Sequence, residues 1–279
     1  MRVCAITNVY NEAFNLPIWL RYYGRQLGLE NCLVIDHGSD DGSTHDLGGA
    51  NRLRIPRVSF DDNVRAEMIS GIANSMLKLY DAVLYTDCDE ILVADPRKYD
   101  SLHAFCARME MPSATAVGLN VIHHLEREAP IDGRAPLMAQ RRYVQFVSPM
   151  CKTLLVREPV NWGGGFHSSN FRPSFGDLYL FHLRWLDLGE SLRRLAVTRR
   201  VRFADSTSGL HQRASFMDCI KNHEALATLP VRTEGFDFSP FLARFLESVR
   251  LSHTNRWFLE KEIRSPELYV VPEAFVEPF

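Results

Sequence analysis

The chain has 279 residues, of which 46% are hydrophobic and 24% charged, and its formal net charge is −2. This composition is typical of a globular protein with one large domain, or one domain with an appendage, and its charge favours neither nucleic acid nor an acidic membrane. The six cysteines include no C-x-x-C pair, which argues against a zinc site or a disulfide framework and indicates a reducing, cytoplasmic location. No apolar run approaches the about 20 residues of a membrane span, so we expect no transmembrane segment, although the protein could lie peripherally at a membrane.

The N-terminal residues predict a strand, a helix and a second strand. Residues 3–9 are mostly apolar, residues 14–26 carry apolar side chains at helical spacing, and residues 32–35 are again apolar. A strand, helix and strand this close together form a βαβ unit and hence a parallel sheet, in which ligands bind at the carboxyl ends of the strands. The acidic loop Asp36–Ser43 follows the second strand and is therefore expected at such an end.

Asp36 is the candidate ligand-binding residue of this loop, because its carboxylate can accept a hydrogen bond from a ribose hydroxyl or a base N–H. Gly38 and Gly42 permit tight turns beside it. The alternative is an ordinary Asx turn, in which the acid only shapes the loop. Residues 53–60 then predict a third strand and residues 63–79 a helix. Arg65, near the start of that helix, could reach a phosphate or could be a solvated surface residue.

The run Val83–Val93 is the most informative stretch of the chain. Three apolar or aromatic residues lead into three carboxylates, and three apolar residues lead out again. Asp87 and Asp89 are two residues apart, so in an extended segment their side chains point the same way and form a hard-oxygen site suited to Mg2+ or Mn2+. The alternative is an acidic turn that faces water, which the apolar flanks disfavour because a buried, unpaired carboxylate is costly.

The middle of the chain predicts a helix over 99–109, strands over 114–123, within 143–156 and over 178–183, and a charged loop over 125–140. Within it, three glycines (Gly163–Gly165) precede His167. Glycines allow a backbone to approach a ligand closely, and the histidine is available as a metal ligand or a base. The alternative is a structural histidine.

From residue 188 onward the pattern becomes helical, with helices expected over 190–201, 215–229 and 241–263. The first of these is rich in arginine, which could meet phosphates or form a solvated face. We therefore divide the chain into a catalytic domain over 1–185 and a helical C-terminal extension over 186–279 packed on it.

Three motifs in this order resemble the family 2-like glycosyltransferases with a GT-A fold. They are Ile6-Thr7-Asn8-Val9-Tyr10-Asn11-Glu12, Ile35-Asp36-His37-Gly38-Ser39-Asp40-Asp41-Gly42-Ser43 and Asp87-Cys88-Asp89-Glu90. Together with Leu16-Pro17, Trp19-Leu20 and Tyr22-Tyr23, they are similar to the branch related to family 92. The resemblance covers residues 1 to about 100 and extends weakly to about 185 through Lys152, His167 and His182.

The resemblance implies a GT-A-like (Rossmann-like), mostly parallel sheet flanked by helices, and the helical C-terminal part lies beyond the residues that it covers. It implies a nucleotide-sugar donor, a UDP-sugar in the first instance, a carbohydrate or lipid-linked acceptor, and Mn2+ or Mg2+ as cofactor. By matching position, Asp87 would contact ribose or metal, and Asp89 and His167 would bind the metal. The residues assigned to the nucleotide are Thr7, Asn8, Tyr10, Glu12, Asp36, Gly38, Ser39, Arg65 and Asp87.

The catalytic base is the point at which the sequence departs from this family. Inverting members usually carry an acidic pair well after the D-x-D motif, and no clear pair is present here. Besides Asp87 and Asp89, the catalytic candidates are Glu126 and Asp177, with Glu128 and Asp132 not distinguished from them. Inversion and retention both remain open.

Three other functions compete with the transferase. A nucleotidyltransferase usually shows a glycine-rich signature with Arg or Lys just after the first strand, which Asn8–Glu12 lacks. A phosphatase of the haloacid-dehalogenase type carries its D-x-D on the first strand. A non-catalytic glycan-binding protein on the same fold would not need an intact pair at Asp87 and Asp89.

Overall fold

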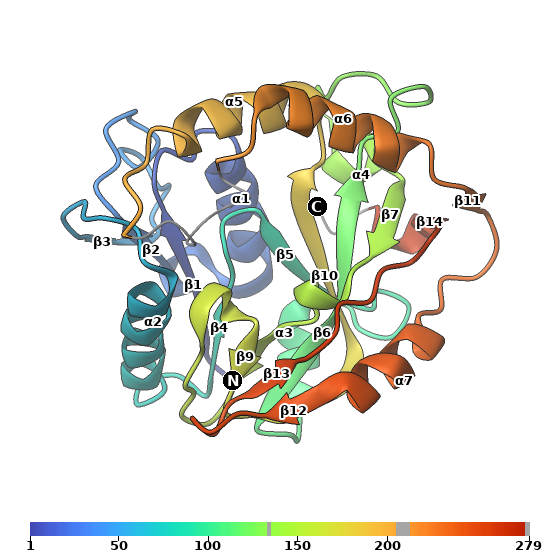
Figure 1. Cartoon of the computed structure of the whole chain (residues 1–279). Helices are drawn as coiled ribbons and strands as arrows, with labels where there is room; N and C mark the ends of the chain where they lie inside the picture. Colours follow the sequence, from blue (N-terminus) through green and yellow to red (C-terminus); the bar gives the residue numbers. More distant parts are fainter. Residues whose placement is uncertain (133–134, 205–212, 277–279) are drawn as a thin grey trace.

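The computed structural model describes residues 1–132, 135–204 and 213–276. They form a mixed α/β fold in which helices flank a large central sheet (Figure 1). The strands are β1 (Val3–Val9), β2 (Cys32–Asp36), β3 (Asn51–Arg54), β4 (Ala82–Tyr85), β5 (Glu90–Ala94), β6 (Ser113–Ile122), β7 (Tyr143–Phe146), β8 (Thr153–Val156), β9 (Ser168–Ser169), β10 (Phe175–Trp185), β11 (Val231–Arg232), β12 (Val249–Leu251), β13 (Trp257–Leu259) and β14 (Leu268–Val270). The α-helices are α1 (Asn15–Leu27), α2 (Asp62–Met76), α3 (Leu102–Arg108), α4 (Leu137–Gln140), α5 (Leu188–Thr198), α6 (Phe216–Ala227) and α7 (Ser239–Ser248), and the short 3-10 turns include η2 (Ser148–Met150) and η3 (Gly164–Phe166).

The N-terminal half of the sheet is parallel, as the sequence predicts. β1 lies between β2 and β4 and pairs parallel with both, and β3 pairs parallel with β2. α1 packs its aromatic side on this sheet, where Trp19, Tyr22 and Tyr23 are almost completely buried. Because these strands run in one direction, the residues after Val9, Asp36 and Tyr85 meet at one edge.

The second half of the sheet is mixed. β8 pairs antiparallel with both β4 and β6, and β7 pairs antiparallel with β6. β10 runs parallel to β6 and antiparallel to β5. All ten residues of β6 are buried, as expected for a strand covered on both faces. The expected parallel arrangement therefore holds for the pairings among β1 to β4, whereas β5, also within the first 95 residues, pairs antiparallel with β10.

Two predicted elements differ from the structure. The strand expected over 53–60 is β3, which ends at Arg54, because Pro56 has no N–H to continue a ladder. The helix expected over 241–263 ends at Ser248, and the chain then forms the β12–β13 hairpin. Asn255 turns this hairpin with a φ of 55°, a left-handed conformation that Asn adopts more readily than most residues.

The C-terminal part is only partly helical and adds strands to the sheets. α5 and α6 pack against each other and run across the top of the view in Figure 1. β14 joins the main sheet beside β7, and β13 pairs with β9. No helix in the described part of the chain is long and apolar enough to cross a membrane.

Candidate functional site

The loops after β1 and β2 are joined by Asn11. Its backbone N–H donates to the Ser39 hydroxyl (3.1 Å), and its side-chain amide exchanges two hydrogen bonds with Asp40 (2.7 and 3.0 Å). Asn11 adopts a left-handed φ of 53°, a conformation that Asn tolerates better than most residues. The first two sequence motifs therefore form one rigid unit at the carboxyl edge of the sheet.

Asp36 lies inside this unit and is closed to solvent. One carboxylate oxygen accepts from the Ser39 N–H (2.7 Å), and the other accepts from the Thr44 hydroxyl (2.9 Å) and Arg52 (2.6 Å). Burial opposes ionisation, but these hydrogen bonds hold the pKa of the Asp36 carboxyl below its ordinary value. The expected contact with a nucleotide would have to replace bonds that already saturate this carboxylate.

The other residues assigned to the nucleotide lie around this loop at different depths. Thr7 is completely buried within β1, so its side chain is not offered to a ligand. Asn8 is half-buried and donates to the Ile35 carbonyl (2.9 Å). Tyr10 is half-buried at the strand end. Gly38 has a φ of 74°, and a Cβ there would lie 2.9 Å from the Cβ of Arg57.

Asp87 is held by neighbours of opposite charge. Its Oδ1 accepts from the Tyr85 hydroxyl (2.7 Å) and from Arg65 (2.9 Å), and its Oδ2 lies 4.0 Å from the Lys152 ammonium. Burial opposes ionisation, but Arg65 and Lys152 keep the pKa of the Asp87 carboxyl below its ordinary value. Arg65 is thus a partner of the D-x-D motif and not a solvated surface residue.

Asp89 faces a histidine from a distant strand. Its Oδ2 lies 3.4 Å from Nε2 of His182, and Nδ1 of the same ring lies 2.8 Å from Oδ1 of Asn120. Sheet register explains this arrangement, because His182 pairs with Glu90 across β10 and β5 and with Asn120 across β10 and β6. The hydrogen bond from the ring to Asn120 leaves Nε2 directed toward Asp89.

Lys152 and Glu90 form a buried ion pair behind the two aspartates. The Lys152 ammonium lies 2.6 Å from Oε1 of Glu90, and both side chains are almost fully buried. Burial opposes the charge on Lys152, but Glu90 and Asp87 raise the pKa of its ammonium above the ordinary value. The carboxylates around the motif are therefore largely balanced by fixed cations.

Glu12 is a buried carboxyl close to this cluster. Its Oε1 lies 2.5 Å from Arg194 on α5, and its Oε2 accepts from the Asn15 amide (3.2 Å). Burial raises the pKa of Glu12 to about 7 against the lowering effect of Arg194, and the charges of Asp89 and Asp87 add to the rise. A residue of the C-terminal part thus contacts the first motif.

His167 lies within electrostatic range of Asp87, Lys152 and His182. Its Nδ1 bonds with the Pro149 carbonyl (2.8 Å). Desolvation by the surrounding atoms and the charge of Lys152 lower the pKa of His167 to about 4, although the side chain reaches solvent. No contact between His167 and Asp89 occurs in the described residues, where His182 takes the place beside that carboxylate.

The three glycines before His167 are constrained by different neighbours. A Cβ on Gly164 would lie 3.0 Å from Oδ1 of Asn63, in the first turn of α2, whereas a Cβ on Gly163 would meet the Ser168 hydroxyl. Gly165 has a φ of 63°. Gly164 therefore lets η3 lie directly on α2, and Phe166 of η3 packs against the Tyr85 ring (4.2 Å between centroids).

In the described residues, the ion pairs of Asp87 and Asp89 include neither of the candidate bases Glu126 and Asp177. Glu126 is exposed beyond the end of β6. Asp177 pairs with Lys98 (2.6 Å) near the start of β10. Five residues of strand separate it from His182, a span of roughly 16 Å.

The donor set fits a divalent cation with two protein ligands. Among the described residues, no three His, Cys, Asp or Glu side chains converge on a point that could hold a metal ion. Asp89 and His182 nevertheless lie at 3.4 Å, close to the roughly 3 Å that separates neighbouring ligands of one ion at about 2.1 Å each. Mg2+ and Mn2+ commonly take one or two protein ligands and complete their shell with substrate phosphates and water.

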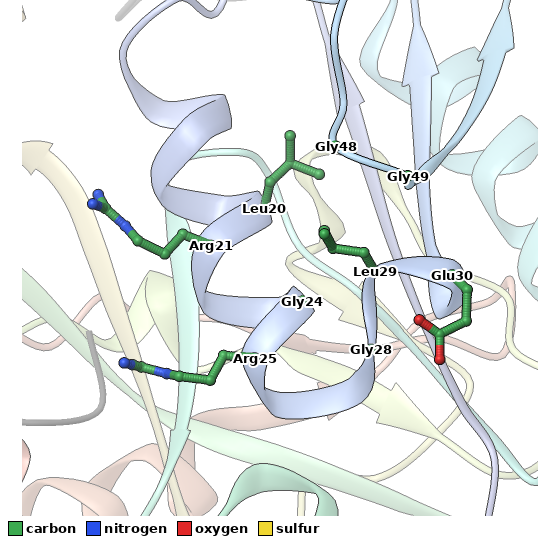
Figure 2. A pocket seen from close by; sticks show the side chains of 9 residues that line it. All are labelled: Leu20, Arg21, Gly24, Arg25, Gly28, Leu29, Glu30, Gly48 and Gly49. Atoms are coloured by element: carbon green, nitrogen blue, oxygen red, sulfur yellow. The ribbon is translucent and has the colours of Figure 1, made fainter.

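A separate hollow of about 600 Å³ lies between the C-terminal half of α1 and the chain before β3. Figure 2 shows Leu20 and Leu29 beside it, whereas Arg21 and Arg25 extend away from Gly48 and Gly49. It lies at the amino end of β2, away from the carboxyl edge. It therefore adds nothing to the candidate site.

No protein-family model matches the sequence, and no curated protein matches it. Among solved structures, a mannose-1-phosphate geranyltransferase from Thermus thermophilus is similar at a TM-score of 0.33 and 12% sequence identity. The match covers 80% of this chain and 68% of that chain. A similarity this low supports no conclusion about fold or activity, so the function must come from the site itself.

Proposed function

We propose that the chain is a divalent-metal-dependent glycosyltransferase that uses a nucleotide-diphosphate-sugar donor. The observation that carries the proposal is the Asp89–His182 pair, whose ring is oriented by Asn120. A histidine ligand oriented through its second ring nitrogen is the usual arrangement at metal sites. The pair lies next to the parallel strand ends at which such sheets bind nucleotides.

In the proposed reaction, the bond between the anomeric carbon and the diphosphate oxygen breaks, and an acceptor oxygen bonds to that carbon and loses its proton. The leaving nucleoside diphosphate gains negative charge, which bound Mn2+ or Mg2+ would offset. Asp89 and His182 would hold this cation. Asp87 would instead keep Arg65 and Lys152 in place, because its carboxylate already pairs with both. The acceptor would be a carbohydrate or a lipid-linked sugar, and a UDP-sugar is the first donor to test.

The proposal is tested by measuring donor turnover across a panel of nucleotide sugars with added Mn2+ or with excess chelator. We expect turnover with the metal only, and loss of turnover in Asp89→Asn and His182→Ala with the fold intact. Asn120→Ala should raise the metal concentration for half-maximal rate by about 10- to 100-fold, the usual cost of losing a residue that orients a ligand.

The matched control is Asp81→Asn at the opposite, amino end of β4, where the carboxylate accepts from the Arg2 N–H (2.6 Å). It should keep wild-type turnover, and His167→Ala should keep the wild-type metal requirement. Full activity of Asp89→Asn in chelator would disprove the proposal. Release of pyrophosphate from a nucleoside triphosphate and a sugar phosphate would indicate a nucleotidyltransferase instead, and sugar binding without turnover would indicate a glycan-binding protein.

A further inference from the structure

Arg57 is a half-buried cation without an acidic partner. Its guanidinium lies over the Tyr10 ring at 3.9 Å from the centroid, and Nη1 lies 3.2 Å from Nδ1 of His37. Within the described residues, no Asp or Glu lies at ion-pair distance from it. Burial and the nearby charge of Arg194 lower the pKa of Arg57. A charge that is partly removed from water usually has a counter-ion, and none of the described residues supplies one to Arg57.

Arg194 approaches the same residue from the other side of the chain. Its Nη1 donates to the carbonyls of Tyr10 (3.0 Å) and Asn11 (3.1 Å), and its Nη2 pairs with Glu12. The side chain remains 36% exposed, so it has donors left for a ligand. Two guanidinium groups therefore contact Tyr10, one through the ring and one through the backbone.

We propose that Arg57 and Arg194 form a phosphate-binding pair at the carboxyl ends of β1 and β2. The planar guanidinium binds phosphate oxygens with two parallel hydrogen bonds, and an anion between two cations would relieve their repulsion. In the context of the proposed function, on which this identification rests, the ligand is the diphosphate of the nucleotide donor. Helix α5, in the C-terminal part of the chain, then contributes Arg194 to donor binding.

The alternative anion, a carboxylate or sulfate, fits the location less well. The pair lies beside the loops after β1 and β2, which parallel sheets of this kind use for nucleotides. Burial opposes ionisation of Asp89, but His182 and, to a smaller extent, the charge of Arg194 lower the pKa of its carboxyl. A diphosphate held by the arginine pair would therefore lie next to the Asp89–His182 pair.

The test measures binding of inorganic pyrophosphate, UDP and uridine to the full chain by titration calorimetry in excess chelator, so that no metal contributes. We expect pyrophosphate and UDP to bind and Arg57→Gln to weaken both by about 10- to 100-fold, the usual effect of losing a charge-assisted hydrogen bond. Arg57→Lys should recover only part of this loss, because an ammonium lacks the planar fork. Uridine binding should not change.

Arg194→Gln should give a similar loss, with Arg194→Lys as the milder variant if the first one disturbs the Asn11 turn. The control is Arg193→Gln on the same helix, an exposed residue whose ion pair is with Glu190, and it should bind like the wild type. Thermal melting without ligand verifies that each variant is folded.

Equal binding of UDP by wild type and Arg57→Gln would overturn the inference, and so would a wild type that binds neither pyrophosphate nor UDP in chelator. These outcomes are separate from the fate of the proposed transferase. Arginine-dependent pyrophosphate binding without any sugar turnover would retain the pair and remove the transferase. Metal-dependent turnover that is unchanged in Arg57→Gln would retain the transferase and remove the arginine pair.

Discussion

Asp87 and Asp89 are two residues apart, yet they have different partners. Alternation along a strand predicts that both carboxylates point to one side, but the motif is a turn in which the Glu90 N–H donates to the Asp87 carbonyl (2.9 Å). Asp87 therefore faces Arg65 and Lys152, and Asp89 faces His182. The sequence predicts where the site lies. The different partners of the two carboxylates come from residues distant in the sequence, so the spacing of Asp87 and Asp89 could not predict them.

A second prediction at the scale of residues concerns His223 and the pH dependence of the free energy of unfolding. The ring is completely buried on α6, its Nε2 bonds with the Ser191 hydroxyl (2.9 Å), and its Nδ1 has no hydrogen-bond partner among the described residues. Burial lowers its pKa to about 4, and the nearby charges of His123, Asp187 and Arg184 contribute smaller shifts. Since the unfolded chain takes up this proton near pH 6.5, the free energy of unfolding should fall as the pH drops from 7 to 4.

Urea denaturation at several pH values tests this prediction. In His223→Gln, which keeps a side-chain amide near Ser191 and cannot titrate, the dependence should be flatter by on the order of 3 kcal/mol over that range. The exposed His45 is the control, and His45→Gln should follow the wild type. Parallel curves for wild type and His223→Gln would refute the role of this ring.

At the scale of elements, a single glycine sets how closely η2 packs on β6. A Cβ on Gly118 would lie 2.3 Å from the Met150 carbonyl carbon and 2.6 Å from the Cys151 nitrogen. η2 carries the Pro149 carbonyl that His167 contacts, and Lys152, the partner of Glu90, follows η2 in the chain. The sequence shows a glycine in a predicted strand, but the element that needs the space follows about 30 residues later and only the fold brings it there.

Gly118→Ala should therefore destabilise the protein by about 1–3 kcal/mol, the usual cost of overpacking, because backbone atoms and not a flexible side chain would have to move. Gly71→Ala in α2 is the matched control, since nothing lies within 4 Å of a Cβ there. It should stabilise the helix by up to about 1 kcal/mol. Chemical denaturation of both variants gives the comparison, and a neutral Gly118→Ala would show that η2 can shift freely.

At the scale of the whole molecule, the sequence predicts the N-terminal half better than the C-terminal half. The βαβ unit and the D-x-D turn arise from local patterns within 95 residues, and the structure has them in the expected places. The C-terminal strands β11 to β14 are two or three residues long, too short to show periodicity, and they form because partners elsewhere in the sheets are available. The contact between Arg194 and Glu12 could not be predicted from local patterns either, because most of the chain lies between the two residues.

The C-terminal strands pair with strands that precede residue 185. We therefore predict that residues 1–185, the expected catalytic domain, do not fold alone. β14 completes the sheet beside β7, and the buried Phe275 packs on Tyr179 (5.2 Å) and Phe181 (5.9 Å between centroids). The fully buried Arg141 would also lose its Asp187 partner (3.0 Å), and a buried charge without its partner costs about 3–5 kcal/mol.

We expect the fragment 1–185 to show no cooperative thermal transition, whereas the full chain melts in one step. Within the full chain, Phe275→Ala should cost about 3–5 kcal/mol, because removing the buried ring leaves a cavity against β10. Circular dichroism melting of the fragment, the full chain and this variant gives the three results together. A fragment that melts cooperatively and binds UDP would show that the catalytic unit ends at residue 185 and that Arg194 is dispensable for binding.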